Sequence, residues 1–451
     1  MGRDLSLLLP ELVLAGAAML MIVAEMARAA RVALGVALAA LAISALLTLQ
    51  VLQADTTVFG GTYRIAMISG WAKLILLPGT ALSLLMTRAE IAGREREGSV
   101  YALIVLVTLG ALMLSGGGDL MLLVLGVVLT GLGSFALVAW PRDDAATEAA
   151  MKYLIFGAVT GAVMIYGLSF WFGGTGSTLY SALERLNGPV IAMAGLVAVI
   201  VGLGYKAALV PFHFWAPDAY QGAPVSIAAY LSVITKTAAF FAFAQILRDL
   251  PRDTGWPVTL ALVSAATMTY GYLAALVQTN LVRLIAYSSV AQSGYFLLGV
   301  VALGVSPFAV PGLLVFAGAY VAMNLGAFAV IMVAGRELSD LEGLGRARPQ
   351  LAVAMVIFLL SLTGIPPLFG FVGKFYLFTA ALDAGFLWVA VIAILNSVLS
   401  LGVYLRMVVP MFRKAEGART AVPVSSPLVV VLAVTVAVTL SFGVLAGFVP
   451  S

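Results

Sequence analysis

Long apolar runs alternate with short polar stretches along the whole chain of 451 residues. Each run has roughly 20 residues, which is enough to cross a hydrocarbon core of about 30 Å as an α-helix. The pattern therefore predicts an all-α polytopic membrane protein with about 14 transmembrane helices and short connections. The predicted spans begin near Leu5, Val32, Ile65, Val100, Leu120, Ala149, Pro189, Pro224, Pro257, Leu284, Pro307, Leu351, Gly385 and Pro427.

The composition fits a membrane protein, because 63% of the residues are hydrophobic and only 10% are charged. A soluble domain typically has about 25% charged residues. The chain has no cysteine, which excludes disulfides and iron–sulfur clusters, and its one histidine argues against a bis-histidine haem or a histidine-rich metal site. The first apolar run, Leu5–Ala27, is longer than the core of a signal peptide, so an uncleaved span is predicted.

Basic residues are distributed unequally between the two sides of the predicted spans. With the N-terminus on the first side, 14 lysines and arginines fall on the second side and 5 on the first. Because basic loops stay in the cytoplasm, the second side is predicted to be cytoplasmic and both termini periplasmic. The second side carries Arg28, Arg31, Arg88, Arg94, Arg96, Arg142, Lys152, Arg283, Arg336, Arg346, Arg348, Arg413, Lys414 and Arg419. The first side carries Arg3, Arg64, Arg185, Arg248 and Arg252.

The span containing GLGYKAALVPFHFWAPDAY (202–220) has helix-breaking residues near its middle. Lys206 follows an apolar run that carries no charge from Pro189 to Tyr205, and Pro211 comes five residues after the lysine. Proline lacks the N–H that an α-helix needs, so Pro211 is predicted to interrupt the helix next to Lys206.

A second span, SLTGIPPLFGFVGKFYLFTA (361–380), repeats this pattern. Gly364, Pro366 and Pro367 predict a helix break shortly before Lys374. Paired interrupted segments in the two halves of a membrane protein indicate the site of a transporter built from inverted repeats. Broken backbone at that depth has to be buried in protein or line a wet cavity.

Five basic residues fall inside the predicted spans, and such residues are functional candidates because a charge at the bilayer centre costs about 2.5–3.5 kcal/mol on insertion scales. Lys206 and Lys374 lie beside the breaks and are interpreted as proton-transport residues; the alternative is that they bind unwound carbonyls. Lys236 is interpreted as a relay between them. Lys73 and Arg406 lie nearer to span ends, where long side chains can reach the interface, so a structural role is favoured.

His213, the only histidine, lies between Phe212 and Phe214 just after the first break. The ordinary pKa of a histidine is near neutrality, which makes this residue a candidate for proton exchange. A buried histidine with satisfied hydrogen bonds in the core is the alternative.

The polar positions inside the spans belong to long and specific motifs. These are VPFHFWAPDAYQGAPVSIAAYLSVITKTA (210–238), QTNLVRLIAYSSVAQSGYFLLG (278–299), LTGIPPLFGFVGKFYLFTAAL (362–382), AAMKYLIFGAVTGAVMIYGLS (149–169) and AYVAMNLGAFAV (319–330). They resemble the antiporter-like membrane subunits of bacterial respiratory complex I (NADH:quinone oxidoreductase), most closely the subunit N family. The resemblance extends from about Tyr101 to Met411, and the first hundred residues match only in pattern.

The resemblance implies a fold of 14 helices with two inverted five-helix repeats, in which helices seven and twelve are broken. Helices one to three would occupy residues 1–98, and helices four to eight, the first repeat, residues 99–250. Helices nine to thirteen, the second repeat, would occupy residues 251–415, and helix fourteen residues 416–451.

The resemblance also implies a proton-translocating subunit that is driven by quinone reduction elsewhere in the complex. The family's proton-path residues fall on Lys206, Lys236, Lys374 and His213. No cofactor is expected in this chain, because NADH, FMN, iron–sulfur clusters and quinone would belong to other subunits.

The partners implied by the resemblance are other membrane subunits of the complex. They include a neighbouring antiporter-like subunit and a long lateral helix from a third such subunit. The lipid bilayer is also expected as a partner, and nucleic acid is not. The expected location is the bacterial inner membrane, with multiple spans and both termini in the periplasm.

Three positions depart from the family pattern. Most members have a glutamate in helix five that pairs with the helix-seven lysine, and Val128 takes its place in GVVLTGLGSFALVA (126–139). Gln292 stands where a histidine is common, and Gln221 where an acid is common. Because a nearby opposite charge favours the charged form of a lysine, Lys206 is expected to be neutral more often than in a relative with the glutamate.

Two other functions remain open. A subunit of a multisubunit cation/proton antiporter or of a hydrogenase-linked complex would share the lysine pattern of helices seven and twelve. The sodium dependence of transport would distinguish such a subunit. The departures at Val128, Gln221 and Gln292 also leave open a structural spacer with impaired pumping, for which a Lys374→Ala change would leave pumping unaltered.

Overall fold

The structure is a computed structural model that describes residues 2–27, 32–186, 188–413 and 424–445. Some features predicted from the sequence lie outside the described residues. They are the basic residues Arg28, Arg31, Lys414 and Arg419 and the predicted boundary between residues 415 and 416.

Helices make up almost all of the regular structure. In chain order they are α1 (Gly2–Leu7), α2 (Leu9–Met26), α3 (Ala33–Val51), α4 (Met67–Ile91), α5 (Glu97–Gly116), α6 (Leu120–Val138), α7 (Asp144–Thr175), α8 (Pro189–Lys206), α9 (Trp215–Gly222), α10 (Val225–Tyr230), α11 (Lys236–Leu247), α12 (Trp256–Ala275), α13 (Leu281–Val301), α14 (Ala309–Ala334), α15 (Leu344–Ala347), α16 (Pro349–Thr363), α17 (Phe369–Asp383), α18 (Leu387–Phe412) and α19 (Ser426–Leu445). A π-helical turn, η4 (Leu231–Thr235), joins α10 to α11. One antiparallel hairpin, β1 (Thr56–Val58) and β2 (Tyr63–Ile65), lies between α3 and α4.

Within the described residues, 11 helices are long and apolar enough to cross a membrane. Three shorter apolar helices, Val190–Lys206, Pro349–Thr363 and Ser426–Phe442, accompany them. Each predicted span coincides with a described helix and begins within a few residues of it. The prediction of an all-α polytopic membrane protein is confirmed, whereas the count of 14 crossings stays a prediction.

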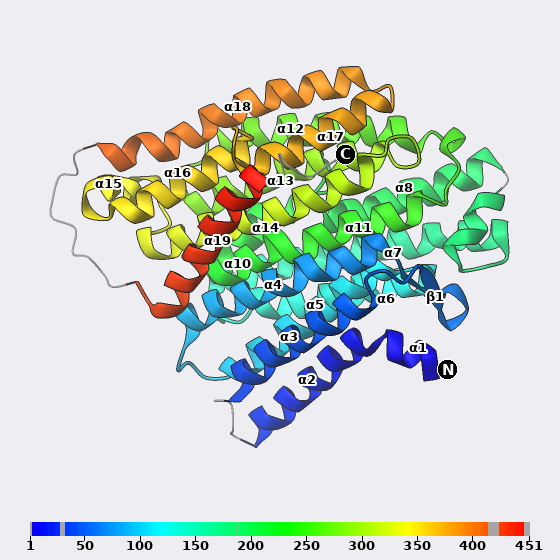
Figure 1. Cartoon of the computed structure of the whole chain (residues 1–451), viewed down its shortest axis with the longest axis horizontal. Coiled ribbons are helices and arrows are strands. Elements are labelled where there is room, and N and C mark those ends of the chain that lie inside the picture. Colours follow the sequence, from blue (N-terminus) through cyan, green and yellow to red (C-terminus); the bar gives the residue numbers. More distant parts are fainter. Residues whose placement is uncertain (1, 28–31, 187, 414–423, 446–451) are drawn as a thin grey trace.

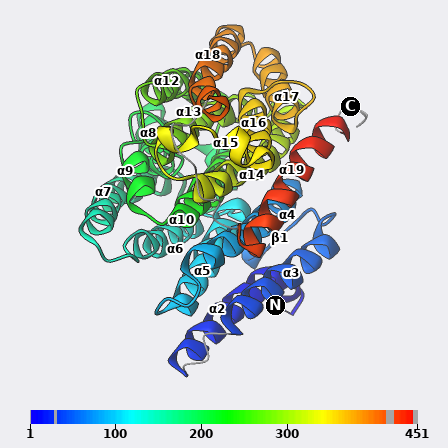
Figure 2. The same ribbon diagram turned by 90° about the vertical axis from the view of Figure 1, so that its left-hand side faces the viewer.

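Most helices run side by side along the long axis of the molecule (Figure 1). Seen from one end, α13 and α14 lie inside the bundle, whereas α2, α3, α7, α12 and α18 lie around its edge (Figure 2). Burial follows this arrangement, because the α10–α11 segment, α13 and α14 are almost wholly buried, whereas less than a third of α3 and of α7 is buried. The interior helices are therefore the ones that can hold charged groups away from lipid.

Polar caps mark the starts of several apolar helices. The side chains of Asp119, Asp143 and Asn280 accept backbone N–H groups at the starts of α6, α7 and α13. Such caps satisfy donors that the first helical turn leaves unpaired. They explain why these helices begin directly after a polar residue with a short side chain.

The structure interrupts the helix at the first predicted break. α8 ends at Lys206 and α9 begins at Trp215, so Pro211 lies in the connection between them. Pro217 falls in the first turn of α9, where the missing N–H of proline is tolerated. Residues 207–209 of the connection are fully buried, as unwound backbone inside a membrane has to be.

The second predicted break separates α16, which ends at Thr363, from α17, which begins at Phe369. Pro366 and Pro367 lie in the connection. Gly364 ends α16 with a φ of 92°, a left-handed conformation that glycine adopts without strain. Thr363 and Phe369, at the two helix ends, are buried, whereas Pro366 and Pro367 between them are exposed, unlike the buried start of the first connection.

Basic residues assigned to the second side of the spans meet at one end of the bundle. Arg283 and Lys152 contact the carboxylate of Asp218 in α9 at 2.6 and 3.1 Å. Gln221, at a position where the family often has an acid, accepts from Arg283 through its side chain and from Arg336 through its carbonyl, both at 3.1 Å. The ends of α7, α9, α13 and α14 are thus tied together on this side.

Candidate proton path

Lys206, the last residue of α8, is 1% exposed, and its Nζ has no hydrogen-bond partner among the described residues. Helix α6 faces this atom, because a Cβ built on Gly131 would lie 3.9 Å from it. A buried charge without a partner is costly. The ammonium form of Lys206 therefore depends on water or on an acid from outside the described residues.

Val128, the expected position of the family's glutamate, points away from the bundle and is 43% exposed. Gly131, one turn later in α6, is the residue next to Lys206. An acid at position 128 would thus approach the lysine from the outer face of α6. The sequence reveals that the acid is missing, and the buried Thr130 and Ser134, one turn apart, mark the inward face of α6 on which Val128 does not lie.

Lys236 is buried at the start of α11, directly after the π-helical turn η4. Its Nζ donates to Ser289 Oγ of α13 at 2.7 Å, and this hydroxyl lies 2.7 Å from the Tyr320 hydroxyl of α14. The same Nζ lies 5.8 Å from the centre of the Tyr220 ring. π-helical turns are frequent at functional sites. Here the turn precedes a lysine whose contacts are hydroxyls and a ring.

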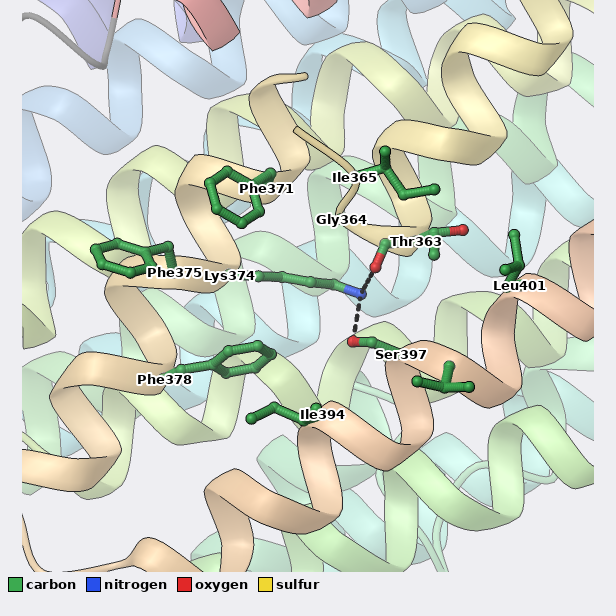
Figure 3. Close-up of a pocket in the computed structure, with 11 residues that line it drawn as sticks. Thr363, Gly364, Ile365, Phe371, Lys374, Phe375, Phe378, Ile394, Ser397 and Leu401 are labelled. Atoms are coloured by element: carbon green, nitrogen blue, oxygen red, sulfur yellow. Dashed lines mark hydrogen bonds between the residues drawn. The ribbon is translucent and has the colours of Figure 1, made fainter. Parts of the chain in front are cut away.

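Lys374 of α17 is buried, and its Nζ donates to the Thr363 carbonyl at 3.0 Å and to Ser397 Oγ at 3.4 Å (Figure 3). It also lies 4.0 Å from the centre of the Tyr295 ring, a cation–π distance. The Thr363 carbonyl belongs to the last turn of α16, where unpaired carbonyls and the helix dipole favour a cation. Lys374 is thus held by neutral groups.

Helix α13 contacts the surroundings of all three lysines. Ser293 Oγ donates to the Ala207 carbonyl in the first break at 2.7 Å. Gln292 Nε2 donates to the Leu362 carbonyl at the end of α16 at 3.0 Å. Ser289, one turn earlier, binds the lysine of α11. One short polar segment of α13 therefore joins both helix breaks and the lysine between them.

Gln292 is at the centre of a neutral polar cluster. Its Nε2 lies 3.0 Å from the Tyr272 hydroxyl and 3.4 Å from the Tyr404 hydroxyl, and the latter lies 2.6 Å from Ser288 Oγ. Its Oε1 has no hydrogen-bond partner among the described residues. Amide and hydroxyl groups therefore stand where many relatives are expected to have a histidine.

His213 is buried in the turn between α8 and α9. Its ring packs edge-on against Tyr270, with centroids 4.6 Å apart, and 6.5 Å from Tyr287. Nδ1 has no hydrogen-bond partner in the described part of the chain, so this is not a core histidine with both nitrogens satisfied. Among the described residues, no group of three or more histidine, aspartate or glutamate side chains could hold a metal ion.

The expectation that Lys73 reaches the membrane interface is wrong. Lys73 of α4 is buried, and its Nζ lies 2.6 Å from a carboxylate oxygen of Glu11 in α2. The Tyr63 hydroxyl donates to the same carboxylate. The partner lies in another span, so no local pattern indicates the pair. Arg406 has the expected structural role, since it donates to carbonyls at the end of α12.

Comparison with known proteins identifies the family. A family model described as NADH:quinone oxidoreductase/Mrp antiporter, TM, matches residues 117–400. NADH-quinone oxidoreductase subunit N 1 of Streptomyces griseus is 39% identical over 404 residues, which cover 88% of this chain and 86% of that protein. The chain belongs to the subunit N family. Subunit N of Heliobacterium modesticaldum is 38% identical over 405 residues, covering 87% of this chain and 85% of the relative.

Solved structures share the fold. A chain of respiratory complex I from Thermus thermophilus, solved with bound aureothin, is 30% identical with a TM-score of 0.87 and 97% coverage of each chain. A chain of the Mrp complex from Dietzia sp. has a TM-score of 0.87 at 22% identity, covering 99% of this chain and 95% of that one, which shows a common fold alone. The resemblance to the subunit N family and the antiporter-like fold is confirmed.

Proposed function

We propose that this chain is a proton-translocating membrane subunit of an NADH:quinone oxidoreductase, in which quinone reduction elsewhere in the complex drives proton transfer. Membership of the subunit N family supports this assignment, since two relatives that bear the name are 38–39% identical over most of the chain. NADH, FMN, iron–sulfur clusters and quinone then belong to other subunits. The neighbours are other membrane subunits, including a second antiporter-like subunit and a lateral helix from a third.

The proposed proton path passes along Lys206, Lys236 and Lys374, with His213 beside the first break. The observation that supports it is that these three lysines are buried without a carboxylate partner in the described structure. An ammonium that is not locked in an ion pair can exchange its proton with hydroxyls or water. The polar segment of α13 adjoins all three positions and supports a continuous route.

The proposed architecture has 14 crossings and two repeats of five. Residues 99–250 hold α5 to α11 and residues 251–415 hold α12 to α18. In both ranges the interrupted helix is the fourth crossing, which supports a repeat. Five crossings place the start of the second copy on the opposite side of the membrane, so the repeats are inverted. Residues 1–98 and 416–451 flank them.

We also propose that the chain lies in a bacterial inner membrane with both termini in the periplasm. The excess of basic residues on the second side supports this orientation. Protons would then be taken up from the end where α7, α9, α13 and α14 meet and released at the end that carries the β1–β2 hairpin.

The test is proton pumping by the assembled complex in vesicles carrying Lys374→Ala or Lys236→Ala. Both changes are expected to reduce pumping per NADH oxidised by the share that passes through this subunit, because each removes a proton-exchanging group. Lys152→Ala is the matched control, since Lys152 is exposed, forms an ion pair with Asp218 and does not belong to the proposed proton path. Normal pumping by an intact Lys374→Ala complex would contradict the path and favour the structural spacer.

A cation/proton antiporter subunit is the second candidate, because the matching family model is described for both NADH:quinone oxidoreductases and Mrp antiporters. The two functions differ in their ion. Pumping that is unchanged when sodium is replaced by choline supports the oxidoreductase subunit, and pumping that requires sodium supports the antiporter.

A further inference from the structure

A pocket of about 330 Å³ opens between α17, α18 and the connection after α16. Lys374 Nζ and Ser397 Oγ form its polar base, and apolar side chains form its walls (Figure 3). The walls are built from Phe371, Phe375, Phe378, Ile394, Val398 and Leu401. The volume falls within the range of about 300–1,000 Å³ that small-molecule pockets occupy.

The mouth of this pocket is apolar and exposed. Phe375, Ile394 and Val398 are 55%, 50% and 65% exposed, and all three are apolar. Helix α16 has 15 residues before it ends at the pocket. At a rise of 1.5 Å per residue this helix carries the chain about 22 Å from its first residue. In a hydrocarbon core of about 30 Å the mouth therefore lies below both membrane surfaces.

The base of the pocket is positively charged whenever Lys374 is protonated. No carboxylate of the described residues pairs with this lysine, whose partners are the Thr363 carbonyl, Ser397 Oγ and the Tyr295 ring. An ammonium has three N–H donors, and only two of them have acceptors here. The remaining neighbour is the uncharged Tyr295 ring, 4.0 Å from Nζ, so the ligand that complements the ammonium is an anion.

We propose that this pocket binds a long-chain fatty acid from the bilayer, with its carboxylate on Lys374 Nζ and its alkyl chain leaving through the apolar mouth. The acid can cross hydrocarbon as the neutral carboxylic acid. Its proton then passes from the carboxyl oxygen to a neutral Lys374 Nζ, which leaves a carboxylate and an ammonium in contact. No net charge enters the membrane. A phospholipid is a poorer fit, because its permanently charged phosphate stays at the interface.

Binding has a consequence for transport, and this part rests on the proposed function. A carboxylate bound to Lys374 favours the ammonium form and withholds the proton from the next group in the path. Fatty acid is therefore expected to inhibit pumping through this subunit. Binding itself does not depend on whether the lysine carries transported protons.

The test uses a palmitic acid carrying a mid-chain diazirine and a terminal alkyne, photolysed with the whole complex in phosphatidylcholine vesicles. Mass spectrometry is expected to find the label on α17 or α18 at the pocket walls. Unlabelled palmitate should compete and hexadecanol should not. Lys374→Met should lower the labelling by about tenfold or more, because it removes one charge-assisted hydrogen bond from the bound carboxylate. Lys374→Arg keeps a positive charge and should retain most of the labelling.

Ile394→Trp and Val398→Trp provide a second test that keeps Lys374. A larger side chain at the mouth should reduce labelling as strongly as Lys374→Met does, and pumping without fatty acid is measured in each variant as its own reference. In these variants palmitate should no longer inhibit proton pumping beyond the proton leak that it causes in the bilayer. That leak is the same for the wild-type and variant complexes and serves as the background. The proposal is overturned if the wild-type complex is not labelled, as would result if a partner covers the mouth. It is also overturned if hexadecanol competes as well as palmitate does. Labelling without any effect on pumping overturns the role of Lys374 in the path but retains the binding site.

Discussion

Two kinds of buried lysine occur in this chain, and their neighbours differ. Lys73 forms an ion pair with Glu11 at 2.6 Å, far from either helix break. Lys206, Lys236 and Lys374 have only neutral neighbours or none among the described residues. A buried ion pair fixes the charge of both partners, whereas a lysine among hydroxyls keeps a proton that it can exchange. The contrast supports the proposed proton path along the other three lysines and indicates a stabilising role for Lys73.

Breaking the Lys73–Glu11 pair is expected to destabilise the N-terminal helices. Lys73→Met or Glu11→Gln alone should cost about 3–5 kcal/mol, because each leaves a buried group without its partner. The double change Lys73→Met/Glu11→Leu should recover most of this loss. Denaturation of the detergent-solubilised protein, followed by circular dichroism, measures both. A double variant as unstable as the single ones would contradict the pairing.

Placing an acid at position 128 is expected to change the pH dependence of pumping. In Val128→Glu a carboxylate approaches Lys206 from the outer face of α6 and favours its charged form. Lys206 then stays protonated to higher pH, so the alkaline limb of pumping against pH should move upward. Leu132→Glu, one turn further along the exposed face, is the control. An equal shift in both variants, or none in Val128→Glu, would disprove the coupling to Lys206.

At the scale of elements, the sequence predicts the interrupted helices but not the hydrogen bonds that hold the interruptions. Glycine and proline beside a lysine in an apolar run predict a break, because these residues end helices regardless of what surrounds them. Ser293 and Gln292 were visible as polar residues of one motif, but their acceptors lie in the connections after α8 and α16. Contacts across about 70 residues or more arise from packing, which leaves no local pattern.

The close fit of Lys374 against Gly364 gives a prediction about the second break. A Cβ at Gly364 would lie 2.9 Å from Lys374 Cδ, and the residue has a φ of 92°. Gly385 also has a positive φ, 83°, but a Cβ built on it would have no other atom within 4 Å. Alanine at either site should cost about 1–2 kcal/mol in backbone strain.

Only Gly364→Ala should also displace the lysine and reduce proton pumping. The comparison of pumping in vesicles at equal amounts of assembled complex separates the two effects. If Gly385→Ala reduces pumping to the same extent, the loss reflects backbone strain and says nothing about Lys374.

At the scale of the whole molecule, the sequence predicts the spans well because hydropathy alone decides which segments leave water. It predicts little about which helices lie inside, since α3 and α14 are both apolar runs and only α14 is almost wholly buried.

The chain has no cysteine in its 451 residues, so an introduced cysteine is the only thiol of the chain that a reagent can label, and this makes the orientation testable.

Single cysteines at Glu184 and Glu148 are expected to lie on opposite sides of the membrane. Both positions are exposed, and the unequal distribution of basic residues places Glu184 in the periplasm and Glu148 in the cytoplasm. A membrane-impermeant maleimide should label Glu184→Cys in spheroplasts and Glu148→Cys only after permeabilisation. The reverse result would invert the proposed topology, and labelling of both would show that the spheroplasts leak.

Helix α13 holds the two interruptions through adjacent residues, Ser293 and Gln292, and this makes it a mechanical link between the halves of the chain. The two side chains project about 100° apart around one rigid axis. A rotation of α13 that tightens one contact therefore strains the other, and neither interruption can be released alone without loss of a hydrogen bond worth about 1 kcal/mol. A movement of α13 about its axis would therefore act on both interruptions at once, because one rigid helix carries both contacts.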